Sequence, residues 1–112
     1  MLIAIPVAND KLDLHFGHCK EFALIKVDQK NQEILSRENV KAPPHQPGFL
    51  PSWLAKLNVN SVIAGGMGQK AQELFAEQNI TVLVGAPQIS PEELVMQYLK
   101  GVLKSGENCC DH

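Results

Sequence analysis

The sequence predicts an α/β domain built on a five-stranded mixed sheet that is covered by helices. Three strand-like segments follow one another in the first half of the chain, whereas helix-like and strand-like segments alternate in the second half. Consecutive strands favour hairpins, and a strand–helix–strand unit favours a parallel pair with a right-handed crossover. A chain of 112 residues suffices for one layered core but not for two.

The composition is that of an ordinary soluble protein and excludes several classes of partner. Twelve acidic and ten basic residues give a net charge of -2, without the basic face that nucleic-acid binding needs. No apolar run approaches the roughly 20 residues of a membrane span, and the first residues lack the basic region of a signal peptide. Three cysteines, an odd number, argue against a disulfide framework. We therefore expect a cytoplasmic protein, monomeric or weakly homo-oligomeric.

The first predicted strand is Met1–Val7, which is nearly all apolar and suits a strand buried on both faces. Pro6 cannot donate a hydrogen bond to a neighbouring strand, so we place it at the C-terminal end of this strand. Ala8–Lys20 is predicted to be a loop.

Two further strands and a second loop complete the first half. Phe22–Asp28 is a predicted strand, and Gln29–Gln32 is polar enough for a hairpin turn. Glu33–Glu38 is a more polar strand, which fits the edge of a sheet. Asn39–Gly48 contains three prolines and His45, and is predicted to be a loop.

The second half predicts three helices separated by two strands. Apolar residues at helical spacing mark a helix over Leu50–Leu57, and Gln69–Gln78 has the same pattern. Ser61–Ala64 and Ile80–Val84 are short apolar strands. Ser90 begins a Ser-Pro-Glu-Glu sequence, typical of an N-cap, a proline in the first turn and a capping box. In the predicted sheet the strands lie in the order 3-2-1-4-5, with the second antiparallel.

This order places a ligand site between the first and fourth strands, where the connections diverge to opposite faces. The loop after the first strand contains His15-Phe16-Gly17-His18-Cys19. The connection after the fourth is Gly65-Gly66-Met67-Gly68, whose backbone N–H groups can point at an anion beside a helix N-terminus. Imidazole and thiolate bind intermediate and soft metals. The site therefore suits an anionic metal–sulfur cluster, and Cys109, Cys110, Asp111 and His112 are further ligand-type residues.

Plainer explanations exist for each feature. Glycines are common in tight strand-to-helix turns, and Cys19 can be a small buried hydrophobic residue. The two cysteines of the tail can belong to a frayed end. A two-metal nuclease is disfavoured because neither Met1–Val7 nor Ser61–Ala64 contains a carboxylate. A cysteine hydrolase using Cys19 and His18 would need a depressed thiol pKa.

The segments HFGHC, VIAGGMGQKAQELF, VLVGA and GENCCDH resemble the dinitrogenase iron–molybdenum cofactor biosynthesis family. This NifX-like domain also occurs at the C-terminus of NifB-type proteins and in the orange protein. The resemblance implies a ribonuclease H-like three-layer α/β/α sandwich, with a single domain over residues 1–104 and a Cys/His-containing tail over 105–112. It also implies a small, non-catalytic binder or carrier of iron–sulfur or molybdenum-containing metal–sulfur clusters, or of their precursors, in cofactor assembly.

Two sets of site residues follow. Phe16, Gly17 and His18 match the family's FGH motif, the glycines of residues 65–68 match its glycine turn, and His45 lies in an HxPG element that resembles a subset of small members.

The expected partners are a cluster and a cluster-assembly protein or ATPase. The alternative is a regulatory or structural interaction module with a partner ATPase, binding a simple metal ion such as zinc. The expected cofactor-binding residues are His15, Phe16, Gly17, His18, Cys19, His45, Gly65, Gly66, Met67 and Gly68, and the expected metal ligands are His15, His18, Cys19, Cys109, Cys110 and His112.

Overall fold

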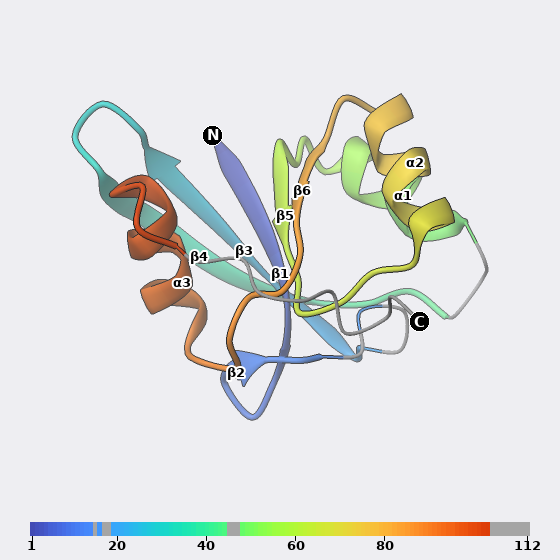
Figure 1. The fold of residues 1–112 in the computed structure, drawn as a ribbon, viewed down its shortest axis with the longest axis horizontal. Helices are drawn as coiled ribbons and strands as arrows, with labels where there is room; N and C mark the ends of the chain where they lie inside the picture. Colours follow the sequence, from blue (N-terminus) through green and yellow to red (C-terminus); the bar gives the residue numbers. More distant parts are fainter. Residues whose placement is uncertain (15, 17–18, 45–47, 104–112) are drawn as a thin grey trace.

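The computed structural model describes residues 1–14, 16, 19–44 and 48–103. A mixed sheet forms the middle layer, with α3 on one face and α1 and α2 on the other (Figure 1). The predicted class, a mixed sheet covered by three helices, is confirmed. The elements are β1 (Leu2–Ala8), β2 (Lys11–Leu12), β3 (Glu21–Asp28), β4 (Glu33–Lys41), α1 (Phe49–Lys56), β5 (Ser61–Ile63), α2 (Gln69–Glu77), β6 (Thr81–Leu83) and α3 (Pro91–Leu99).

The sheet runs in the order β4-β3-β1-β5-β6, and the short β2 pairs with β1 outside this path. β3 is antiparallel to both β1 and β4, whereas β1, β5 and β6 are parallel to one another. The β1–β5 register pairs Ile3 with Ser61 and Ala4 with Val62. The C-terminal ends of β1 and β5 therefore lie at one edge of the sheet, and their connections start there.

The sequence predicted a loop directly after β1. The structure differs, because Lys11–Leu12 pairs with β1 as the short strand β2. A two-residue turn, Asn9-Asp10, joins β1 to β2, and both residues have positive φ angles, 53° and 63°. This is the backbone of a type I′ hairpin, which asparagine and aspartate adopt more easily than most residues. The hairpin carries the chain back over the sheet edge before residue 13.

Pro6 lies inside β1, one residue further from the strand end than predicted. Its carbonyl accepts a hydrogen bond from Asp13 N at 2.8 Å, on the side of β1 that faces β2. The N–H and C=O groups of one strand residue point to the same side, so the missing donor of Pro6 also faces that side. The ladder to β5 involves Ile3 and Ala4 only, so Pro6 lies beyond it and interrupts no paired hydrogen bond.

The β3–β4 hairpin is longer than the sequence predicted. Asp28 Oδ1 accepts hydrogen bonds from Lys30 N and Asn31 N, which forms the turn. β4 continues to Lys41, whereas the loop was predicted to begin at residue 39. β4 is an exposed edge strand with only scattered half-buried residues, so no apolar pattern marks this extension. The register shifts between Lys26 and Val27, so the edge strand contains a bulge.

Apolar residues of β1, β3 and β5 alternate between the two faces, and each face has its own core. Leu54 of α1 and Phe75 of α2 pack on one face, and Leu94 and Val95 of α3 pack on the other. The first core contains Ala4, Phe16, Cys19, Phe22, Leu24, Leu54, Val59, Val62, Ala64, Met67, Phe75 and Ile80. The second contains Ile3, Ile5, Val7, Leu12, Ala23, Ile25, Val27, Ile63, Ala86, Leu94 and Val95.

The helices start and stop where the sequence chemistry requires. Ser90 Oγ accepts a hydrogen bond from Glu93 N at 3.3 Å, as the predicted capping box requires, and Pro91 occupies the first turn. After the three helices, Asn58, Asn79 and Gly101 have φ angles of 67°, 60° and 73°, the left-handed conformation that ends a helix. Among the described residues, no helix combines the length and apolar character needed to cross a membrane.

Arg37 of β4 joins three elements on the α3 face. Its guanidinium contacts Asp10 of the β1–β2 turn at 2.7 Å and Glu92 of the first turn of α3 at 2.5 Å. The hydrogen bond to Glu92 raises the pKa of Arg37 above its ordinary value. Leu12 N also donates to Ile89 O at 3.0 Å. The β1–β2 hairpin is therefore fixed to both the sheet and the start of α3.

Candidate functional site

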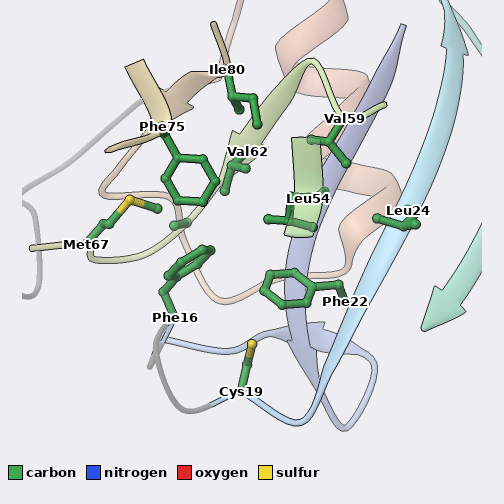
Figure 2. Packing of buried hydrophobic residues seen from close by; sticks show 12 residues of the cluster. Phe16, Cys19, Phe22, Leu24, Leu54, Val59, Val62, Met67, Phe75 and Ile80 are labelled. Atoms are coloured by element: carbon green, nitrogen blue, oxygen red, sulfur yellow. The ribbon is translucent and has the colours of Figure 1, made fainter. Parts of the chain in front are cut away.

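The site loop, residues 13–20, is fixed to the protein by one aromatic side chain. Phe16 is 5% exposed, and its ring contacts Phe22 of β3 and Phe75 of α2 edge-on, with centroids 5.6 Å apart in both pairs. Figure 2 shows the three rings in the core of the α1/α2 face. Phe16 therefore joins the loop to the sheet and to the helix that follows the glycine turn.

Cys19, a predicted ligand, also lies in this core. It is 9% exposed, and Figure 2 shows its sulfur directed toward the cluster of apolar side chains. Burial, with a smaller contribution from the charge of Asp13, raises the pKa of the thiol from 9.0 to about 12. At neutral pH the thiol is protonated, which disfavours its use as a nucleophile.

Leu14 of the site loop lies against Gly65 of the glycine turn, residues 65–68. A Cβ atom built on Gly65 would be 2.5 Å from Leu14 Cδ2 and 3.5 Å from Leu14 Cα. No side chain fits there while Leu14 keeps its place. Gly65 is therefore glycine because the residue before His15 packs directly on its backbone.

Hydrogen bonds to the carbonyl groups of the glycine turn also fix its backbone. Gly65 O accepts from Gly85 N at 2.9 Å, and Met67 O accepts from Gln72 Nε2 at 2.9 Å. Met67 is 2% exposed and lies beside Phe75 and Phe16 in Figure 2. The predicted site residues Phe16 and Met67 thus contribute by packing in the core.

Gly68 differs from Gly65, because no packing reason explains it. It is the N-cap of α2, with no side-chain cap hydrogen bond and no acidic residue in the first helical turn. Among the residues that the structure describes, a Cβ atom at Gly68 would meet nothing within 4 Å. The N-terminus of a helix attracts anions through its free N–H groups and its dipole. The helix terminus at Gly68 is therefore suited to a negatively charged ligand.

A cavity that the sequence did not predict adjoins both ends of the site loop. Its volume is about 640 Å³, and both ends of the loop, Asp13 and Lys20, line it. Lys41 also lines the cavity. It is the last residue of β4, beyond the predicted end of that strand. The other lining residues are Val7 and Ala8 at the end of β1, Asn9 of the β1–β2 turn and Glu21 at the start of β3. Of these, only Asn9 lies in a segment with a sequence signal of its own, the Asn-Asp turn.

Several predicted site residues lie outside the described part of the chain. Within residues 1–14, 16, 19–44 and 48–103, no group of three or more His, Cys, Asp or Glu residues could hold a metal ion. The predicted imidazole and tail ligands, and Gly17, therefore stay predictions. They are His15, His18, His45, Cys109, Cys110 and His112.

The fold and the site define a small α/β domain with a loop and a glycine turn in contact at the sheet edge. The family model described as dinitrogenase iron-molybdenum cofactor matches residues 1–101. The chain belongs to this family.

Individual proteins are similar to the chain in sequence or in fold. The chain is 32% identical over 111 residues to the uncharacterized protein MJ0580 of Methanocaldococcus jannaschii, which covers 96% of this chain and 92% of that protein. The crystal structure of PH0822 matches with a TM-score of 0.85 and 25% identity, over 94% of both chains. The apo form of the orange protein from Desulfovibrio gigas matches with a TM-score of 0.73 and 21% identity, over 96% of this chain and 93% of that one.

Proposed function

We propose that this protein binds and carries an iron–sulfur or molybdenum-containing metal–sulfur cluster, or a precursor, during metallocofactor assembly, without catalysing a reaction. The observation that carries the proposal is the packing of Leu14 on Gly65, which brings the site loop onto the glycine turn. Membership of the dinitrogenase iron-molybdenum cofactor family supports it. The two segments combine soft ligands with amide donors, the two kinds of group that an anionic cluster needs.

Within this proposal the residues have different roles. His15 and His18 bind metal through imidazole nitrogens, and the backbone of Gly66 and Gly68 faces the anionic sulfides. Phe16 and Met67 hold the two segments in place from the core, consistent with their burial. His45, Gly17 and the ligand-type residues of the tail complete the proposed site.

The proposal includes the setting of the protein. The order β4-β3-β1-β5-β6 with antiparallel β3 supports the ribonuclease H-like α/β/α topology that the family resemblance implies. We assign the domain to residues 1–104 and the tail to 105–112. We place the protein in the cytoplasm as a monomer or weak homo-oligomer, with a cluster-assembly protein or ATPase as its partner.

Anaerobic purification followed by iron, molybdenum and sulfide analysis tests the proposal. We expect sulfide in near-stoichiometric amounts with the metal, and an absorption spectrum with charge-transfer bands above 300 nm, roughly where metal–thiolate and metal–sulfide clusters absorb. A protein that is colourless, lacks metal and takes up neither kind of cluster in reconstitution would refute the proposal. Zinc without sulfide would instead support the interaction module.

A pair of variants in one loop tests the ligand assignment. His18→Ala removes an imidazole ligand, so cluster retention should fall about tenfold or more, since the loss of even a hydrogen-bond partner of a metal ligand typically costs that much. Lys20→Ala is the matched control, since Lys20 is exposed in the same loop and offers no soft ligand. Equal retention in the two variants would remove His18 from the site.

A further inference from the structure

One rung of the sheet presents an apolar, an acidic and a basic side chain on three neighbouring strands. Val7 of β1 pairs with Glu21 of β3, and Glu21 pairs with Lys41 of β4. Residues that lie opposite each other in paired strands have their side chains on the same face of the sheet. Val7 belongs to the α3-face core, so Glu21 and Lys41 also lie on that face.

The β1–β2 hairpin encloses a cavity together with this rung. All three residues of the rung line the cavity, whose volume is about 640 Å³, and so do Ala8 and Asn9, where β1 enters its turn. The next residue, Asp10, contacts the guanidinium of Arg37 of β4 at 2.7 Å. This ion pair fixes the turn to the edge strand, so the wall that the hairpin contributes to the cavity is held in place.

The acid and the base of the rung are both available to a ligand. Glu21 and Lys41 lie opposite each other on β3 and β4, a position in which opposite charges attract. Within the part of the chain that the structure describes, every ion pair involves Arg37, so neither Glu21 nor Lys41 is engaged in one. The cavity therefore presents one carboxylate and one ammonium group on adjacent strands.

This arrangement suits a zwitterion better than a net anion or a net cation. The described lining contains two bases and two acids, which are Lys20, Lys41, Asp13 and Glu21, so its formal charges cancel. A ligand with a net charge of either sign would meet repulsion as well as attraction there. A free α-amino acid has its ammonium and carboxylate groups on one carbon atom, close enough to reach Glu21 and Lys41 on strands about 4.8 Å apart.

We propose that this cavity binds a free α-amino acid with an apolar side chain. Glu21 accepts hydrogen bonds from the ammonium group of the ligand, and Lys41 donates to its carboxylate. Val7 and Ala8, at the β1 end of the rung, contact its side chain. The volume is within the range of about 300–1,000 Å³ that small-molecule sites have. Since the site needs neither a metal nor a cluster, it is independent of the proposed function.

Calorimetric titration and amide NMR of the metal-free protein test the inference, with L-leucine, L-methionine and L-phenylalanine as probes. We expect at least one probe to bind and to shift the amide signals of Val7, Ala8 and Asn9. The N-acetyl and amide derivatives of that probe each lack one charge, so each should bind about tenfold more weakly or worse. No binding by any probe, equal binding of a derivative, or shifts at Gly66 and Gly68 instead would overturn the inference.

Three variants examine the roles of the two charged residues. Glu21→Gln and Lys41→Met remove a charge at nearly constant size, so each should lower the affinity about tenfold through one lost charge-assisted hydrogen bond. Lys26→Met is the matched control, because Lys26 is an exposed lysine of β3 that pairs with Leu2, on the α1/α2 face. Melting temperatures show that each variant is folded. Unchanged affinity in both charge variants, or an equal loss in Lys26→Met, would contradict the assignment.

Discussion

The substitution Gly65→Ala tests the contact that joins the two halves of the candidate site. The added methyl group would lie 2.5 Å from Leu14 Cδ2, far inside the van der Waals contact distance. Leu12 Cδ2 and Leu14 Cα, each at 3.5 Å, are at ordinary contact distance, so Leu14 Cδ2 is the atom that must move. No positive φ is involved, so the whole effect comes from packing.

The magnitude follows from what Leu14 must do. Leu14 is half-buried, so its side chain can rotate away, but it then loses contact with the α3-face core. Overpacking of this kind costs about 1–3 kcal/mol. For a domain of this size the melting temperature should fall by roughly 4 °C for each kcal/mol. We therefore expect a decrease of roughly 4–12 °C for Gly65→Ala.

Gly68→Ala is the matched control in the same turn. Its methyl group meets no described residue within 4 Å, and the φ and ψ angles of -63° and 153° are open to alanine. The free energy of unfolding should change by less than about 0.5 kcal/mol. Urea unfolding followed by Trp53 fluorescence measures both variants under one condition.

A double-mutant cycle identifies Leu14 as the cause. Leu14→Ala alone should cost about 1–2 kcal/mol through lost apolar burial. In Leu14→Ala protein the methyl group of Gly65→Ala has room, so the double variant should be more stable than the sum of the single effects by about 1 kcal/mol or more. Strict additivity, or equal stability of the Gly65→Ala and Gly68→Ala variants, would refute the packing argument.

Three further substitutions test other parts of the structure. Phe16→Ala removes both edge-to-face contacts and leaves a cavity, so urea unfolding should show a loss of about 3–5 kcal/mol, with Phe16→Leu losing less; equal losses would contradict the aromatic contribution. Cys19 should resist iodoacetamide in folded protein at pH 8 and react after unfolding. Because the folded thiol has a pKa of about 12 against 9.0 for the ordinary thiol, its contribution to stability is complete below pH 9 and lost as the pH rises toward 12. The stability difference between the unmutated protein and Cys19→Ala should therefore shrink over that interval, and a constant difference would contradict the burial of the thiol. Arg37→Met should cost about 1 kcal/mol or less, because Asp10 and Glu92 are partly exposed, and the loss should diminish in 1 M NaCl; no dependence on salt would exclude the ion pairs as its cause.

The strongly patterned elements could be predicted from the sequence. The capping sequence at Ser90 located α3, and the apolar runs located β1, β3 and β5 within one or two residues. β2 was missed because two residues give no periodicity, although Asn9-Asp10 is a recognisable hairpin turn. The end of β4 was missed because an edge strand exposes residues on both faces, so its polar sequence resembles a loop.

The site could be predicted at the level of segments but not of side-chain direction. The sequence order of strands and loops was enough to bring Leu14 and Gly65 to one edge. Whether Phe16 and Cys19 point into the core depends on the preceding hairpin, which sets the direction in which the chain re-enters the loop. That hairpin was not predicted, and a short irregular loop has no periodicity from which to assign an inner face.

Pro6 limits how the start of the site loop is attached to the sheet. The β1–β5 ladder ends at Ala4, and beyond it the same side of β1 is occupied by β2. Pro6 offers that side a carbonyl, which accepts from Asp13 N at 2.8 Å, but no N–H donor. At this position the first strand can therefore hold the start of the site loop as an acceptor only.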